Sequence, residues 1–113
     1  MNPEAISHPI RARIAISSAA TREEAHRIAH ALLEARIAAC VNIVEHIHSI
    51  YRWQEEVEEA DEVMLFIKTT EDHLIAVEET LKTLHSYQLP EFVVLPVVGG
   101  SLAYLQWLTT SVR

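Results

Sequence analysis

The chain has 113 residues, of which 50% are hydrophobic, and its 9 basic and 16 acidic residues give a formal net charge of −7. This length suits a single domain with one modest core. Lys and Arg do not cluster anywhere in the sequence, so no nucleic-acid partner is predicted. Cations or other proteins are better matched to the negative net charge.

The N-terminal residues and the cysteine content bear on the compartment. We expect a loose tail over residues 1–9, followed by a single domain over residues 10–113. The opening MNPEAISHPIRAR contains no apolar run, which predicts neither a signal peptide nor a membrane span. Cys40 is the only cysteine and has no internal disulfide partner, so we expect a reducing, cytoplasmic location.

The first half of the chain predicts a strand, a helix and a long strand. Residues 11–17 alternate in part and predict the first strand. The segment from Thr21 to Glu24 has capping-box form, in which the Thr21 hydroxyl accepts from the Glu24 amide and the Glu24 carboxylate returns to the Thr21 amide. A helix therefore begins here. From residue 37 the chain becomes rich in β-branched residues, which predicts a strand extending to Trp53.

The second half predicts an acidic turn over residues 55–62, a buried strand over 63–67, a helix after Thr69 or Thr70, a strand over 92–95 and a short helix capped by Ser101. The order of elements is β-α-β-β-α-β with an additional C-terminal helix. We therefore predict an α+β fold of the ferredoxin-like type.

The length of the second strand indicates self-assembly. If residues 37–53 are extended at about 3.3 Å per residue, the strand reaches about 50 Å. A compact chain of this size has a radius of gyration of about 13 Å. The hairpin formed by the second and third strands is thus expected to project, and its apolar, unpaired edges favour a closed homo-oligomer.

Three groups of side chains are candidate cation sites. The run from Glu55 to Glu62 carries six acids in eight residues, without the spacing or the glycine of a calcium loop, which favours a solvated turn. His26 and His30 stand at i, i+4 on the first helix. His46 and His48 stand at i, i+2 on the long strand. Each pair lacks a third ligand, so surface positions are favoured for both.

Catalytic motifs are weak, and we expect no enzyme. Cys40 and His85 could form a thiolate–base pair, but no glycine elbow or orienting acid accompanies Cys40. The two glycines are adjacent and form no phosphate loop. The small apolar neighbours of Cys40 favour a packed thiol over a ligand, with both possibilities open.

The motifs AACVNI, SIYRW, IKTT, HSYQLPE and LPV occur in the order and spacing of the CutA divalent-cation tolerance family, which the chain resembles from about Ile14 to Arg113. The resemblance implies a ferredoxin-like subunit assembled as a homotrimer, with an architecture similar to that of PII signal proteins. It also implies a role in tolerance of copper and other divalent ions, with copper binding possible and no obligatory cofactor.

The resemblance also implies site residues. Cys40 and His85 are the metal-ligand candidates, suited as a thiolate–imidazole pair to Cu(I) or Zn(II). Three positions depart from the family pattern: Glu55 replaces a frequent glycine, Ser86 replaces a frequent proline, and Glu45-His46 replaces a proline-glycine kink. The residues expected around a cleft between subunits are Tyr51, Trp53, Glu62, Lys68, Tyr87 and Glu91.

Two functions follow as hypotheses. The first is a metal-binding trimer that buffers or senses copper-like ions. The alternative is a PII-like signalling or scaffold trimer whose clefts between subunits bind a small molecule or a partner. In either case Lys68, which ends an apolar strand, needs a carboxylate such as Glu91 or Glu62, because an unpaired buried ammonium is unfavourable.

Overall fold

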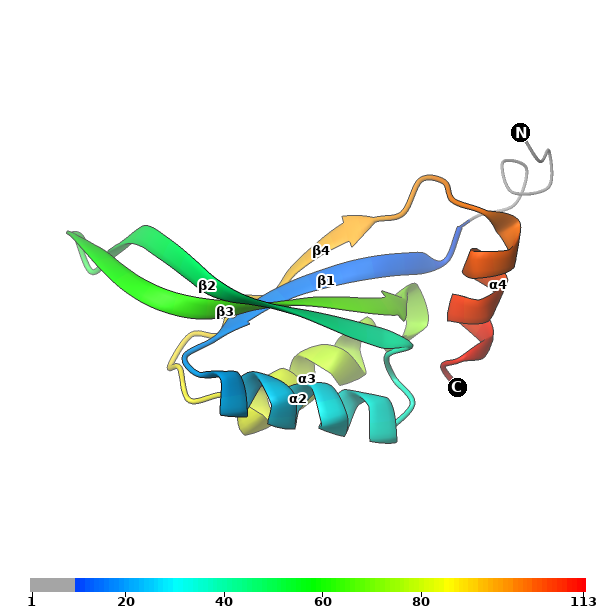
Figure 1. Cartoon of the computed structure of the whole chain (residues 1–113), viewed down its shortest axis with the longest axis horizontal. Coiled ribbons are helices and arrows are strands. Elements are labelled where there is room, and N and C mark those ends of the chain that lie inside the picture. The colour runs from blue at the N-terminus through cyan, green and yellow to red at the C-terminus, as the bar shows by residue number, and fades with distance from the viewer. Residues whose placement is uncertain (1–9) are drawn as a thin grey trace.

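A computed structural model describes residues 10–113, so the expected tail over residues 1–9 lies outside the described part of the chain. The predicted order of elements and the additional C-terminal helix are confirmed (Figure 1). The elements are β1 (Ala12–Ala19), α2 (Arg22–Glu34), β2 (Cys40–Trp53), β3 (Glu56–Thr70), the short helix η1 (Glu71–His73), α3 (Leu74–Leu84), β4 (Val93–Pro96) and α4 (Leu102–Thr110).

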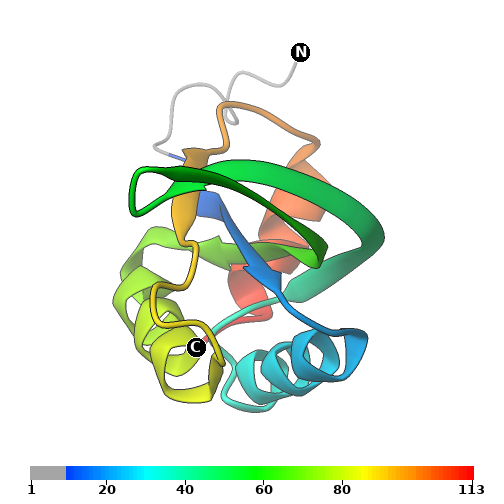
Figure 2. The same cartoon turned by 90° about the vertical axis from the view of Figure 1, so that its left-hand side faces the viewer.

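The four strands form one antiparallel sheet in the order β2-β3-β1-β4. In its register, Ile16 of β1 lies opposite Phe66 of β3 on one side and opposite Val93 of β4 on the other. Figures 1 and 2 show α2 and α3 together on a single face of this sheet. The two helices and the sheet therefore form two layers with one core between them.

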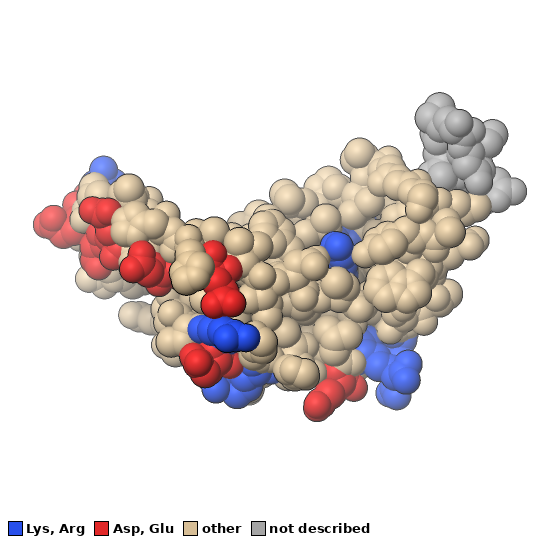
Figure 3. Space-filling model, viewed as in Figure 1, with Lys and Arg blue, Asp and Glu red and all other residues tan. Residues whose placement is uncertain are grey.

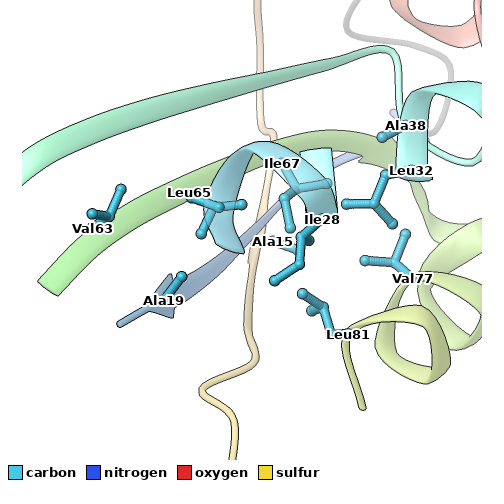
Figure 4. Packing of buried hydrophobic residues seen from close by; sticks show 11 residues of the cluster. Ala15, Ala19, Ile28, Leu32, Ala38, Val63, Leu65, Ile67, Val77 and Leu81 are labelled. Carbon is cyan, nitrogen blue, oxygen red and sulfur yellow. The ribbon is translucent and has the colours of Figure 1, made fainter. Parts of the chain in front are cut away.

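The core lies between the odd-numbered residues of β1 and β3 and the apolar stripes of the two helices (Figure 4). Leu65 and Ile67 of β3 are fully buried. Burial of each such side chain contributes roughly 1.5–3 kcal/mol. Their main partners on the helices are Ile28, Leu32, Val77 and Leu81.

The N-terminus of α2 retains one half of the predicted capping box. The Thr21 hydroxyl accepts a hydrogen bond from the Glu24 amide at 3.1 Å, as predicted. The return bond to the Thr21 amide was predicted wrongly: the Glu24 carboxylate instead accepts from the amides of Ala20 at 3.1 Å and Ser86 at 2.9 Å. Glu24 thus joins the start of α2 to the loop after α3.

The predicted projecting hairpin is confirmed, but its acidic turn is much shorter than expected. The chain measures 49 × 27 × 23 Å, with a radius of gyration of 15.3 Å. Residues 56–62 belong to β3 and pair with β2, so the interpretation of residues 55–62 as a turn was wrong. Only Gln54 and Glu55 turn the chain, with positive φ angles of 50° and 72°.

A bulge in β2 keeps apolar side chains on one face of the hairpin. Val44 lies opposite Met64 and Ile47 lies opposite Glu62, so two residues of β2 are inserted between these pairs where β3 has one. His46 adopts a φ angle of 64° at this point. Because side chains alternate along a strand, the extra residue places Ile47 on the same face as Val44.

Candidate functional site

The sheet face opposite α2 and α3 is largely uncovered. Helix α4 covers only its end, where Leu105 and Leu108 pack against Ala12 and Ala39. Figure 3 shows acidic side chains gathered over the hairpin, a mostly uncharged surface over the upper part of the body, and charged side chains along the lower edge of the body. An exposed apolar face of this kind marks an interaction surface. Its apolar residues are Ile14, Ile16, Val44, Met64, Phe66, Val93 and Leu95.

An acidic cluster lies on this face where the body meets the hairpin. The Tyr87 hydroxyl donates a hydrogen bond to Glu62 at 2.8 Å. Burial and the neighbouring Glu62 charge both raise the pKa of Tyr87, with a smaller contribution from Tyr51. Burial also raises the pKa of Glu91, as does the Glu62 charge. The structure therefore brings together three of the six expected cleft residues, Glu62, Tyr87 and Glu91, whereas Tyr51 lies opposite Glu58 on the hairpin.

His85 forms hydrogen bonds to the loop that carries Tyr87 and to β1. Its Nδ1 atom accepts from the Tyr87 amide at 3.0 Å, so Nε2 carries the proton and donates to the Ser18 carbonyl. The imidazole is neutral in this arrangement, and both of its nitrogens are engaged. His85 thus positions the loop that carries Tyr87, and a metal ion at His85 would displace one of these two bonds.

Lys68 lies at the opposite end of the same face. Its Nζ atom donates to the Tyr104 hydroxyl at 3.3 Å and lies 5.6 Å from the centroid of that ring. The expected contact with Glu91 or Glu62 is not made within one subunit, because Lys68 lies six residues along β3 from Glu62, which is about 20 Å. Trp53, opposite Glu56, lies at the far tip of the hairpin.

Cys40 lies at the start of β2, opposite Lys68, and is half-exposed. Cys40 is therefore not fully buried in the described chain, and the packing of its thiol in the assembled protein stays a prediction. Cys40 borders a hollow of about 290 Å³ that is also lined by His30, Trp107 and small or aliphatic side chains. The sequence paired His30 with His26, whereas in the structure His30 and Cys40 line the same hollow.

The structure does not bring Cys40 and His85 together in one subunit. Cys40 lies opposite Lys68, whereas His85 is bound to Ser18, which lies opposite Met64. Four residues along β3 separate these positions by about 13 Å, and metal–ligand bonds are only about 2.0 to 2.3 Å long. Within residues 10–113, no three His, Cys, Asp or Glu side chains are placed to hold a metal ion.

His48 on the hairpin is held between two carboxylates. Its Nδ1 atom lies 2.8 Å from Asp61 and its Nε2 atom lies 2.7 Å from Glu59. The bonds to Glu59 and Asp61 raise the pKa of His48. The bulge at His46 interrupts the alternation on which the predicted His46–His48 pair depended. His48 therefore joins β2 to β3 and has no ring nitrogen free to bind a metal ion.

These features define a ferredoxin-like domain with an uncovered apolar sheet face and a projecting hairpin. The family model of the CutA1 divalent ion tolerance protein matches residues 13–111, and the chain belongs to this family.

Known relatives agree with this assignment. The divalent-cation tolerance protein CutA of Thermus thermophilus is 50% identical over 88 residues, which cover 78% of this chain and 85% of that protein. The rice protein CutA 1, chloroplastic, is 44% identical over 92 residues, 81% of this chain and 52% of that longer protein. The crystal structure of CutA1 from Oryza sativa has a TM-score of 0.89 at 38% identity and covers 93% of this chain and 96% of that one.

The family is named for ion tolerance and not for a chemical reaction. Across residues 10–113, no helix combines the length and the apolar character that a membrane crossing requires.

Proposed function

We propose that the chain is a cytoplasmic, non-enzymatic homotrimer that binds copper or other divalent ions and so contributes to divalent-cation tolerance. Membership of the CutA1 family supports the link to divalent ions. The observation that carries the metal part of the proposal is the hollow that Cys40 shares with His30.

Assembly is supported by the uncovered sheet face. Val93 and Leu95 of β4 are 48% and 44% exposed, although they continue the apolar surface of β1 and β3. Strand β2 is an edge strand, and an unpaired edge beside an apolar face favours association. A closed ring of subunits would cover this surface on every copy.

The Cys40 hollow offers donors that suit a soft cation. Thiolate sulfur favours Cu(I), and imidazole is accepted by copper and zinc alike. His30 lines the same hollow as Cys40, whereas both nitrogens of His85 form hydrogen bonds. We therefore propose Cys40 and His30 as the metal ligands of one subunit. The expected role of His85 would require a rearranged contact between subunits.

Calorimetric titration of the protein with Cu(I), Cu(II) and Zn(II) tests this proposal. Cys40→Ser and His30→Gln are expected to weaken Cu(I) binding at least about tenfold, because each removes one donor. His26→Gln is the matched control, since it lies one turn earlier on the same helix and outside the hollow. Unchanged Cu(I) affinity in Cys40→Ser would exclude this site. Weakening by Cys40→Ser and His85→Gln, but not by His30→Gln, would instead favour Cys40 and His85 as the ligand pair.

The tyrosine–carboxylate cluster favours a second candidate function. Tyr87, Glu62 and Glu91 present aromatic and acidic groups at one place, which suits a PII-like scaffold with a small cationic ligand. Metal dependence of thermal stability separates the two candidates. A metal-binding trimer is stabilised by Cu(I), whereas a scaffold of this kind is not.

A further inference from the structure

We propose that Lys68 of one copy binds to the acidic pair Glu62 and Glu91 of a neighbouring copy, so that this cluster is completed only by assembly. The inference depends on the proposed homotrimer and adds a specific contact that orients its subunits. Both partners lie on or beside the uncovered sheet face, at its two ends.

The acidic pair lacks a counter-charge within the subunit. Glu62 and Glu91 are both half-buried, and the charge of Glu62 disfavours ionisation of Glu91. The Tyr87 hydroxyl supplies Glu62 with a hydrogen bond but with no positive charge. None of the ion pairs among residues 10–113 involves either carboxylate. Two like charges in partial burial favour the approach of a cation.

Lys68, in turn, lacks a negatively charged partner among residues 10–113. Lys68 is half-buried as a residue, and its ammonium group contacts the Tyr104 hydroxyl and ring, which carry no full negative charge. Within the described part of the chain, its Nζ atom has no carboxylate within 4.0 Å. A hydrogen bond from the lysine ammonium to a carboxylate is stronger than one to a phenol hydroxyl.

The distance between Lys68 and the acidic pair prevents them from forming an ion pair inside one subunit. Lys68 and Glu62 are separated by six residues on the same face of β3, which is about 20 Å. Met64 and Phe66 lie between them and form the apolar part of the surface. A second copy that covers these apolar side chains can therefore place its Lys68 beside the acidic pair of the first copy. Such a head-to-tail contact repeats around a closed ring.

Charge reversal and its rescue test the proposed contact. Light scattering on dilution from micromolar to nanomolar protein is measured for the wild type, Lys68→Glu, Glu91→Lys and the double variant. Each single reversal places like charges together and is expected to shift dissociation to at least about tenfold higher concentration. The double variant, which exchanges the charges, is expected to recover much of the wild-type stability of assembly. Lys82→Glu, on the solvent side of α3, is the charge-matched control.

Circular dichroism identifies variants that fail to fold, and for these Lys68→Met and Glu91→Gln are measured instead, each with an expected weakening of assembly. Wild-type-like assembly of both single variants would overturn the contact while leaving the homotrimer in place. A double variant no more stable than the singles would also overturn it. A monomeric wild type would overturn the homotrimer itself, and this contact with it.

Discussion

At the scale of single residues, Glu24 illustrates how one buried carboxylate joins two parts of the chain. It is 4% exposed and accepts hydrogen bonds from Ala20 and Ser86. Burial alone would raise its pKa, but the hydrogen bonds from Ser86 and Ala20 outweigh burial and hold the pKa below its ordinary value of 4.5. The charged form is therefore the one that stabilises the native state.

Glu24→Gln is expected to lower the free energy of unfolding by about 1–3 kcal/mol at neutral pH, because the amide replaces an acceptor oxygen with a donor. The native pKa is lowered, so the contribution of Glu24 is complete above pH 4.5 and is lost as the pH falls through the native value. Denaturant unfolding in steps from neutral to acidic pH measures the difference. Glu23→Gln, exposed in the same turn, should change little. Equal losses in the two variants would contradict this role for Glu24.

At the scale of elements, the β2–β3 turn places two non-glycine residues in the left-handed region. Gln54 and Glu55 have φ angles of 50° and 72°. L-residues lose roughly 1–2 kcal/mol in this conformation, whereas glycine adopts it readily. Glu55 occupies the position at which the resemblance to the CutA family implies a glycine. The long register between β2 and β3 therefore retains the turn in spite of the unfavourable residue.

Glu55→Gly is expected to raise the free energy of unfolding by up to about 1 kcal/mol, since relief of the backbone strain exceeds the added flexibility of the unfolded chain. Glu58→Gly, within the extended part of β3, should instead lower stability by roughly 0.5–1 kcal/mol. Denaturant midpoints at a single fixed protein concentration compare the two variants. A destabilised Glu55→Gly variant would show that the turn does not store this strain.

At the scale of the whole molecule, the uncovered sheet face predicts that isolated subunits do not persist. Light scattering at micromolar concentration should give three times the chain mass of 12.8 kDa. Leu95→Gln is expected to weaken this assembly, because Leu95 is 44% exposed on the uncovered face and its polar replacement would lose apolar burial between subunits. Ile75→Gln, at a 75% exposed position on α3, should leave the mass unchanged. Equal masses for both variants at all concentrations would contradict assembly through this face.

Local sequence patterns alone determined the elements and their order. The Thr21 cap, the apolar spacing of α2 and the β-branched run of β2 depend on residues that are near one another in the chain, so their physical causes can be read without a structure. The same patterns led to the ferredoxin-like fold and to the projecting hairpin, both of which are observed. The acidic run after Glu55 was misread because its pairing with β2, and not its composition, makes it a strand.

Only the tertiary structure decided which side chains meet. Ser86 reaches Glu24, His30 reaches the Cys40 hollow and Lys68 meets Tyr104 through contacts between residues 10 or more positions apart. Such contacts depend on strand register, on the bulge at His46 and on the packing of helices against the sheet. A register difference of one residue between β2 and β3 would turn the side chains of one strand to the opposite face of the sheet. Spacing along the chain therefore identified candidate residues, whereas their partners depended on the fold.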